Sequence, residues 1–320
     1  IAVGGTGPEG VDELLRNADV AMYMAKNAGK GRVAVFDPAA HAAMLQRLET
    51  EADLKRAVQR EEFVLHYQPI VDLQTGALVG LEALVRWEHP ERGQVPPTAF
   101  IPLAEETGLI VPIGRWVLRQ ACRQAQRWQE EYPTEPPRRM AVNLSGVHLQ
   151  QPMVVEDVAQ ALAESGLSPR SLTLEITESV MMYDTATTVG KLQALKELGV
   201  SLAIDDFGTG YSSLSYLQQF PIDLLKIDRA FVSGVGQGIT DSALARAVVT
   251  LGSSLGVQTV AEGIEQPEQA EQLRELGCER GQGYYFAPPQ DGQMMTALLR
   301  KAQSGAAWTT PQPVREPEAA

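Results

Sequence analysis

The chain has 320 residues and carries 40 acidic against 27 basic side chains, for a formal net charge of −13 at neutral pH. This acidity argues against binding to duplex nucleic acid, which needs a basic face, and a hydrophobic content of 44% excludes a disordered chain. Two cysteines are too few for a disulfide scaffold. The sequence has no signal peptide and no apolar run of membrane-spanning length. We therefore expect a cytoplasmic protein that makes no membrane contact.

Three segments fall outside the central region of the chain. Apolar residues at helical spacing predict a helix over 11–26, and short strands are expected at 1–3 and 32–36. Residues 1–37 are too few to form a core of their own. We interpret 1–37 as the tail of a larger domain. A second helix is expected over 38–60, where it would act as a linker. The proline-rich residues 302–320 are expected to form a disordered tail.

Residues 61–301 alternate between β-prone runs and helical segments. The runs are 63–70, 78–87, 140–143, 172–175, 201–205, 224–226, 259–262 and 283–286. The intervening helices are expected at 111–129, 154–165, 187–198, 243–255 and 267–276. Eight strands alternating with helices predict an α/β fold, a TIM-like (β/α)8 barrel. The gap between Ile70 and Leu78 is too short for a parallel crossover, so the first two strands should form an antiparallel hairpin.

Polar residues end most of these runs, where (β/α)8 barrels have their active sites. They are Glu82, Arg86, Asn143, Glu175, Asp205, Asp206, Lys226, Asp228, Glu262 and Gln282. Carboxylates that meet at one barrel mouth repel one another unless cations neutralise them, and oxygen ligands without histidine favour Mg²⁺ or Mn²⁺ over zinc. The adjacent Asp205 and Asp206 favour two ions, as in two-metal hydrolysis of phosphoesters. Lys226 could hold the attacking water, and Arg86 could bind a phosphate oxygen.

The same residues carry a family resemblance. Glu82-Ala83-Leu84-Val85-Arg86 resembles the EAL signature of bacterial cyclic di-GMP phosphodiesterases. Further matches follow in order: Tyr67-Gln68-Pro69-Ile70, Val142-Asn143-Leu144-Ser145, Glu175-Ile176-Thr177-Glu178, Asp205-Asp206-Phe207-Gly208, Lys226-Ile227-Asp228, Ala261-Glu262-Gly263 and Gln282-Gly283-Tyr284. This ordered set is specific and covers roughly 54–299. Separately, residues 18–32 resemble the C-terminal end of GGDEF diguanylate cyclase domains.

The resemblance implies a bacterial signalling enzyme that hydrolyses cyclic di-GMP to linear pGpG, using water activated by two Mg²⁺ or Mn²⁺ ions. The implied metal ligands are Glu82, Asn143, Glu175, Asp205, Asp206 and Glu262. The implied catalytic residues are Lys226, Glu262 and Gln282, and Gln68 and Arg86 would contact the dinucleotide. Glu178 would anchor the loop from Asp206 to Leu214, through which a homodimer is implied. Ca²⁺ is expected to bind without supporting turnover.

Two alternative functions stay open. A catalytically silent cyclic di-GMP receptor would share the fold, but such receptors usually lack some metal ligands, and every ligand position is retained here. An enolase-like, metal-dependent barrel enzyme also has carboxylates and a lysine at its strand ends. The Asp205–Asp206 pair, Arg86 and the antiparallel hairpin count against that enzyme. Taken by itself, Asp228 is typical of a helix N-cap or of a partner for Lys226.

Overall fold

The structure is a computed structural model that describes residues 10–27, 31, 33–182, 185–208, 217, 219–235, 242–303 and 308. The chain divides into two compact units, residues 1–60 and 61–320. Helices α1 (Gly10–Asn27) and α2 (Pro38–Arg60) belong to the first unit and match the two helices expected there. The strand expected at 32–36 is wrong for 33–36, which have no regular secondary structure. Residues 1–3 lie outside the described part.

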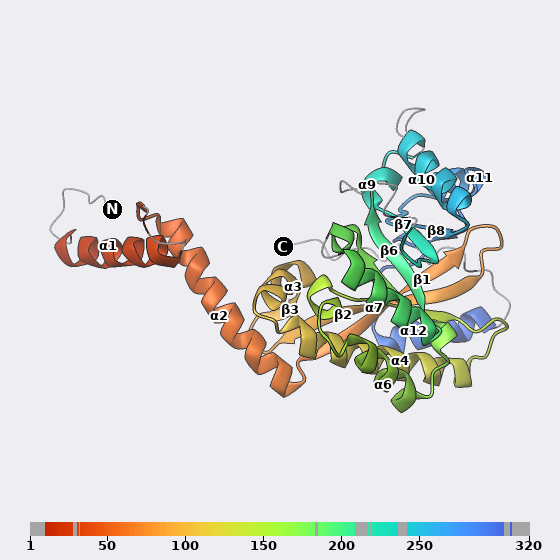
Figure 1. The fold of residues 1–320 in the computed structure, drawn as a ribbon, viewed down its shortest axis with the longest axis horizontal. Coiled ribbons are helices and arrows are strands. Elements are labelled where there is room, and N and C mark those ends of the chain that lie inside the picture. The colour runs from red at the N-terminus through yellow and green to blue at the C-terminus, as the bar shows by residue number, and fades with distance from the viewer. Residues whose placement is uncertain are drawn as a thin grey trace. The chain divides into compact units, whose positions relative to one another are not determined.

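The second unit is built on one closed sheet (Figure 1). Its strands are β1 (Phe63–Asp72), β2 (Leu78–His89), β3 (Gly93–Val95), β4 (Arg139–Asn143), β5 (Leu172–Thr177), β6 (Ser201–Phe207), β7 (Leu224–Ile227), β8 (Gln258–Ala261) and β9 (Arg280–Gly281). Neighbouring strands from β2 through β4 to β9 run parallel, and β1 closes the barrel by pairing antiparallel with both β2 and β9. The predicted barrel with an antiparallel β1–β2 hairpin is confirmed.

Two strands differ from the prediction. Strand β3 adds a short antiparallel extension to β2 and is too short for a periodic signal. The last barrel strand is Arg280–Gly281, whereas the predicted run 283–286 forms a turn. Its aromatic residues are typical of a strand, but the amides of Phe286 and Ala287 both donate to the carbonyl of Gly283 and close a turn. Gln282 therefore follows the last strand instead of preceding it.

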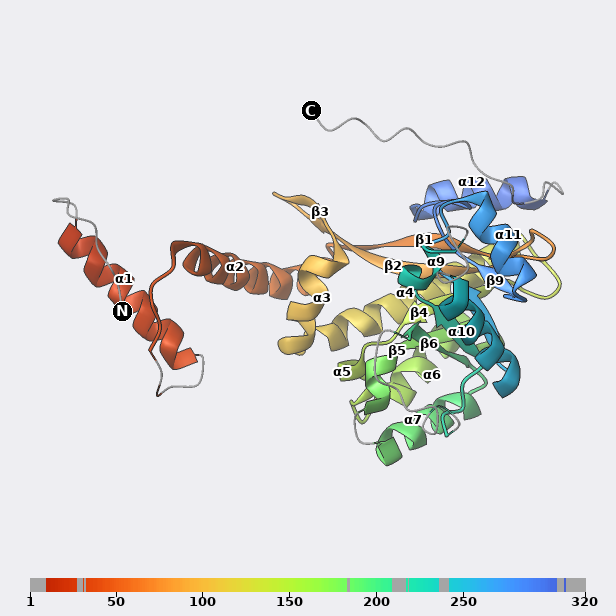
Figure 2. The same ribbon diagram turned by 90° about the horizontal axis from the view of Figure 1, so that it is seen from above.

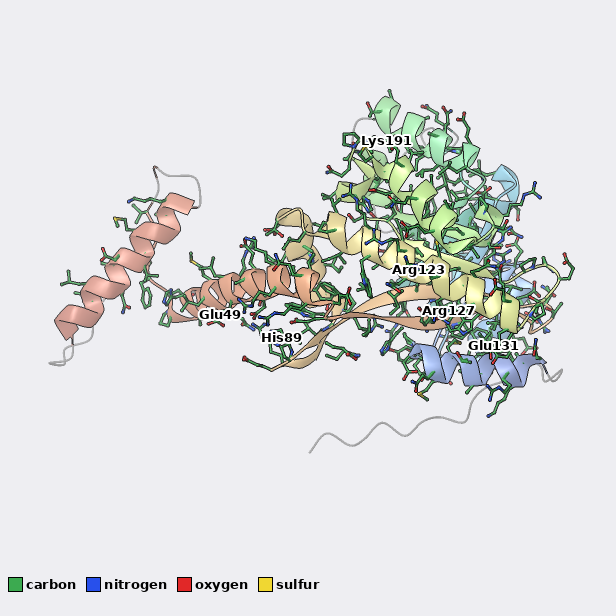
Figure 3. The ribbon with its side chains drawn as sticks, turned by 90° about the horizontal axis from the view of Figure 1, so that it is seen from below. Glu49, His89, Arg123, Arg127, Glu131 and Lys191 are labelled. Carbon is green, nitrogen blue, oxygen red and sulfur yellow. The ribbon has the colours of Figure 1, made fainter. Side chains whose placement is uncertain are left out.

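Helices cover the outside of the barrel (Figure 2). The expected helices are α4 (Ile110–Glu131), α6 (Val154–Ser165), α7 (Thr185–Glu197), α10 (Ser242–Leu255) and α11 (Pro267–Glu275). The described residues also form α3 (Pro97–Glu106), α5 (Gly146–Leu149), α9 (Arg229–Val232) and α12 (Gly292–Gln303), and 3₁₀ helices span Pro169–Ser171 and Glu178–Met182. Arg123 and Arg127 point outward from α4 (Figure 3), and Arg123 pairs with Glu164 of α6. None of the described helices has the length and apolarity that a bilayer crossing needs.

The barrel interior contains an apolar waist between two polar ends. The waist consists of one buried residue from each of five strands: Ile70, Ala141, Ala203, Leu224 and Val260. Because side chains two residues apart share a face of a strand, the polar residues above and below the waist also enter the barrel. Above it, at the C-terminal ends of the parallel strands, lie the predicted site residues. Below it lie Asp72, Arg139, Ser201 and Gln258, and the guanidinium of Arg280 hydrogen-bonds to Gln258.

Candidate active site

The centre of the upper end is the ammonium group of Lys226, a side chain on β7 that is only 1% exposed. Its Nζ lies 2.6 Å from Oε2 of Glu175, 3.1 Å from Oδ1 of Asp205 and 2.5 Å from Oε1 of Glu262. A fourth oxygen, Oε2 of Glu82, is 3.7 Å away. These carboxylates come from or directly follow four different strands, β5, β6, β8 and β2. Closure of the barrel therefore brings four acidic groups onto one cation.

Amide groups hold the buried carboxylate of Glu82 in place. Nδ2 of Asn143 donates to its Oε1 at 2.7 Å, and Nε2 of Gln282 donates to its Oε2 at 2.6 Å. The same Gln282 nitrogen donates to Oε1 of Gln68 at 2.8 Å, and Nε2 of Gln68 donates to the carbonyl of Ala287 at 3.1 Å. Because Glu82 is 5% exposed, these donors replace water around its charge. The network joins the first barrel strands to the last.

The adjacent aspartates serve the same site because of an unusual backbone conformation. Successive side chains of a strand point to opposite faces, which would separate Asp205 from Asp206. Asp206 instead has φ of 53°, and the pairing of β6 with β7 is irregular between Ile204 and Phe207. As a result, ligand oxygens of Asp205, Asp206 and Glu262 lie within 4.8 Å of one another and could hold a metal ion. A left-handed, non-glycine residue of this kind is typical of functional sites.

The protonation equilibria reflect burial and crowding of like charge. Burial raises the pKa of Glu262 to about 8, with Asp205 and Glu82 adding to the shift against the opposing effect of Lys226. Burial, Asp205 and Asp228 raise the pKa of Asp206 to about 6. Burial works against the charge of Lys226, but the surrounding carboxylates outweigh it and raise the pKa of Lys226 well above its usual value. Lys226 therefore stays an ammonium group.

The pKa of Glu82 moves in the opposite direction. Burial would raise it, but Lys226 and the hydrogen bonds from Gln282 and Asn143 outweigh burial and lower the pKa. One ammonium cannot neutralise four carboxylates and the adjacent Asp206, so the site retains an excess of negative charge. The available donors are carboxylate oxygens and one amide, a set that suits a hard divalent cation. The residues present therefore fit a metal ion.

Two predicted residues lie beside this cluster. Arg86 is half-buried on β2 and donates from Nη1 to the carbonyl of Val85 at 2.9 Å, so no hydrogen bond links it to the carboxylates within the described part of the chain. Glu178 is 4% exposed, and its Oε2 accepts a hydrogen bond of 2.8 Å from the amide of Gly208. Glu178 thus binds the first residue after β6. Residues 209–216, which make up most of the predicted loop, lie outside the described residues.

The sequence left other polar groups at this end with alternative roles or with no role. Asp228 caps α9 by accepting a hydrogen bond of 2.8 Å from the amide of Ala230, which fits the N-cap interpretation. The carbonyl of Ala287 orients Gln68 and has no sequence signal, because it is backbone. Tyr284 is 64% exposed in the turn after β9. The misplaced strand at 283–286 hid Tyr284, although an aromatic residue two positions after Gln282 was a visible signal.

Comparisons with known proteins agree on one family. The EAL domain model matches residues 51–289. The chain is 43% identical over 287 residues to the bifunctional diguanylate cyclase/cyclic di-GMP phosphodiesterase MucR of Pseudomonas aeruginosa, covering 90% of this chain and 42% of MucR. It is 40% identical over 299 residues to the cyclic di-GMP phosphodiesterase NbdA of the same species, covering 93% and 38%. The chain thus spans about two fifths of the length of its curated relatives.

Solved structures with bound dinucleotide resemble the fold. The PaMucR phosphodiesterase in complex with c-di-GMP has a TM-score of 0.73 at 43% identity, covering 77% of this chain and 99% of that one. The EAL enzyme Bd1971, bound to cAMP and cyclic di-GMP, has a TM-score of 0.77 at 33% identity, covering 90% and 75%.

Proposed function

The chain belongs to the EAL domain family, and on that premise we propose that residues 61–301 hydrolyse cyclic di-GMP to linear pGpG. The observation that carries this proposal is the gathering of four carboxylates around Lys226 at the C-terminal end of the barrel. The names of MucR and NbdA and the dinucleotide bound in their structural relatives support the substrate. A receptor without catalysis would not need this complete set of ligands.

Two Mg²⁺ or Mn²⁺ ions would be held by the oxygen donors of the site. These donors belong to Glu82, Asn143, Glu175, Asp205, Asp206 and Glu262. When bound, the ions supply Lewis acidity toward the phosphate and lower the pKa of water. Support for them comes from the excess negative charge and from the oxygen-only donor set.

The protein's own side chains orient the reactants. In the reaction, water attacks phosphorus, the bond from phosphorus to the 3′ oxygen breaks, and a proton ends on the 3′ hydroxyl. Lys226 donates to Glu175, Asp205 and Glu262, which fixes their direction and keeps a positive charge beside the developing negative charge. The amide of Gln282, held by Glu82 and Gln68, would contact the attacking water.

The dinucleotide would meet Gln68 and Arg86 at the rim of the cluster. Arg86 makes its hydrogen bond to a carbonyl and no ion pair among the described residues, so its remaining donors can bind a phosphate oxygen. Because barrel strand β2 carries both Glu82 and Arg86 on the same face, substrate on the cluster would lie beside the guanidinium.

The remaining segments are assigned roles in a longer signalling protein. Residues 1–37 would be the C-terminal remnant of a GGDEF domain and 38–60 a linker helix. The disordered tail expected at 302–320 would begin after Gln303, where α12 ends. The MucR alignment covers 90% of this chain, more than the EAL match over 51–289, and the name of MucR includes a diguanylate cyclase. A homodimer would form through the loop 206–214, whose first part is held by Glu178. We expect a cytoplasmic location.

The test is incubation of the chain with cyclic di-GMP, with separation of the products by liquid chromatography. We expect linear pGpG with Mg²⁺ or Mn²⁺, none after chelation with EDTA, and binding without product in Ca²⁺. Equilibrium dialysis in the same buffers separates the alternatives. Binding without product in every metal would indicate a silent receptor, and absence of both binding and product would overturn the proposal.

A further inference from the structure

Helix α5 follows strand β4 after two residues and leads toward α6 (Figure 2). Strand β4 ends at Asn143, which donates from Nδ2 to Glu82 in the cluster. Asn143 is exposed, so hydrogen bonds and its backbone decide where its side chain points, and packing does not. Ser145, two residues further on, caps α5 by accepting a hydrogen bond of 3.2 Å from the amide of His148. A shift of α5 would therefore move Asn143.

A helix of four residues is not stable by itself, because nucleation costs more free energy than its few hydrogen bonds return. Lys191 of α7 (Figure 3) donates from Nζ to the carbonyls of Leu149 and Gln150 at 3.0 and 2.6 Å, which satisfies the C-terminal end of α5. At the other end, a Cβ atom at Gly146 would lie 3.1 Å from Cγ2 of Val180, so α5 packs against the 3₁₀ helix that precedes α7. Neighbouring elements therefore decide the position of α5.

A network of three side chains fixes α5 to two longer helices. Nε of Arg115 on α4 donates to Oδ2 of Asp157 on α6 at 2.8 Å, and Nε2 of His148 on α5 lies 3.0 Å from the same oxygen. Burial lowers the pKa of His148 despite Asp157, so the ring is neutral at neutral pH and its Nε2 carries the proton. Burial would raise the pKa of Asp157, but the hydrogen bonds from Arg115 and His148 outweigh burial and lower it. His148 therefore donates to a carboxylate that Arg115 holds in place.

The buried ring of His148 is not the choice that stability alone would favour. His148 is 0% exposed, and its Nδ1 has no hydrogen-bond partner among the described residues. A Cβ atom at Gly114 would lie 2.5 Å from Nδ1, so α4 can approach the ring only because this residue has no side chain. A buried acceptor without a partner costs free energy, whereas a leucine of similar volume would bury no such group. What the imidazole adds is the directed hydrogen bond from Nε2 to Asp157.

A second ion pair between α4 and α6 offers a comparison. Nη2 of Arg123 lies 3.0 Å from Oε2 of Glu164, and the two side chains are 43% and 34% exposed. Arg115 is similarly exposed, at 39%, but Asp157 is only 11% exposed. Glu164 lies about two helical turns after Asp157 along α6. The Arg123 pair can therefore hold α4 to α6, whereas the Arg115 pair also reaches α5 through His148.

We propose that Arg115, Asp157 and His148 are positioning residues, which hold α5 so that Asn143 and Glu82 can bind a metal ion. The inference rests on the proposed function, because it requires a metal ion on the cluster. Among the described residues this network has no hydrogen bond to the cluster, so it acts through the backbone between His148 and Asn143. Groups behind a metal ligand typically contribute about 10-fold to 100-fold to metal affinity or activity. Because this network acts through the backbone, we expect the lower limit.

The first test replaces His148 and measures the binding of Mn²⁺ without substrate by titration calorimetry. His148→Leu fills the space and loses the donor, and should raise Kd for Mn²⁺ about 10-fold. His148→Gln retains an amide donor near the position of Nε2 and should recover most of the affinity. The Tm of His148→Leu in EDTA should stay within about 4 °C of the wild type, because the unpartnered Nδ1 is removed together with the hydrogen bond.

Hydrolysis of cyclic di-GMP at increasing Mn²⁺ concentration supplies a second readout. In His148→Leu, the Mn²⁺ concentration at half-maximal rate should rise by the same factor as Kd, whereas KM at saturating Mn²⁺ should stay within about two-fold. A merely unfolded fraction would instead lower the rate at every Mn²⁺ concentration and leave the half-maximal concentration unchanged. That pattern would overturn the inference.

A matched pair of variants on α4 keeps the test decisive if His148→Leu does not fold. Arg115→Gln should raise Kd for Mn²⁺ about three-fold, because a partly exposed ion pair contributes less than a buried hydrogen bond to a charged group. Arg123→Gln should leave Kd unchanged. Equal effects of these two changes, or no effect of Arg115→Gln, would overturn the inference, and so would a His148→Gln variant as weak as His148→Leu.

The result for the wild type separates this inference from the proposed function. A wild type that binds Mn²⁺ but does not hydrolyse cyclic di-GMP would overturn the proposed function, and Kd for Mn²⁺ would still decide the role of His148. A wild type that binds neither Mn²⁺ nor Mg²⁺ would overturn both.

Discussion

The two polar ends of the same barrel handle charge in opposite ways. At the lower end, Nη1 of Arg139 donates to Oγ of Ser201 at 3.3 Å, and Nη2 of Arg280 donates to Oε1 of Gln258 at 2.8 Å. Burial lowers the pKa of Arg280, and so does the charge of Arg139, while Asp72 and Glu279 oppose both. Two basic and two acidic groups therefore act on this end electrostatically, and their formal charges balance.

The upper end shows no such balance. Four carboxylates lie within 4 Å of the single ammonium of Lys226, and Asp206 adds a fifth acidic group beside them. At both ends, interior polar residues lie two positions along their strands from the same apolar waist. The barrel architecture therefore does not by itself require the excess of negative charge at the upper end. The lower end can be stable by itself, whereas the upper end needs a cation from solution. Unbalanced buried charge, rather than buried charge as such, distinguishes the candidate site.

Turnover should separate the two ends most strongly. Glu82→Ala removes a carboxylate of the cluster and should reduce kcat for cyclic di-GMP by at least about a thousand-fold, because such groups contribute several kcal/mol of transition-state stabilisation. The matched change at the lower end, Arg139→Gln, should leave kcat unchanged. Product analysis by liquid chromatography measures both. Equal losses in the two variants would show that the difference between the ends has no catalytic meaning.

Stability in chelator should depend on Lys226 more than on Arg280. Lys226→Met leaves buried carboxylates without a counter-ion and should lower the free energy of unfolding by about 3–5 kcal/mol. Arg280→Met should cost only about 1 kcal/mol, the ordinary effect of a substitution, because Glu279 and Asp72 keep hydrogen bonds to neighbouring groups. Urea unfolding in EDTA measures both. A larger loss for Arg280→Met would contradict the comparison.

Metal addition should stabilise the protein through the upper end only. A saturating divalent cation at one hundred times its Kd adds about 2.7 kcal/mol to the stability of the folded state and raises Tm. Asp205→Asn should remove most of this shift in a thermal melt with Mn²⁺, and Asp72→Asn at the lower end should retain it. A full shift in Asp205→Asn would place the bound cation elsewhere.

The pH dependence should be the smallest effect. Burial raises the pKa of Glu262 to about 8, above the value of an unfolded glutamate near 4.3, so the folded state holds its proton longer. The metal-free protein should therefore lose stability as pH rises from about 5 to 8, with a slope of at most about 1.4 kcal/mol per pH unit for this group. The guanidinium groups of the lower end do not titrate in this window.

Urea unfolding at pH 5, 6.5 and 8 in EDTA measures this slope, and Glu262→Gln is the matched variant that should flatten it. Bound Mn²⁺ favours the charged carboxylates and should abolish the loss of stability. A metal-free stability that increases over the same range would contradict the raised pKa of Glu262.

The sequence by itself determined the elements and the residue types of the site. Helical periodicity and strand alternation are local properties, so α2 and α6 match their expected ranges, and the short gap after Ile70 was enough to predict the antiparallel hairpin. Because functional residues of such barrels follow the strands, the acidic residues at the strand ends could be listed without coordinates.

Only the tertiary structure decided how those residues meet. The bond from Gln282 to Glu82 joins residues 200 positions apart, and the left-handed conformation of Asp206 has no signature in its residue type. The turn at Gly283 depends on contact with the backbone of Ile264, so the run 283–286 was taken for a strand. These contacts between distant residues form only when the barrel closes. Local sequence cannot specify which strand ends then lie side by side.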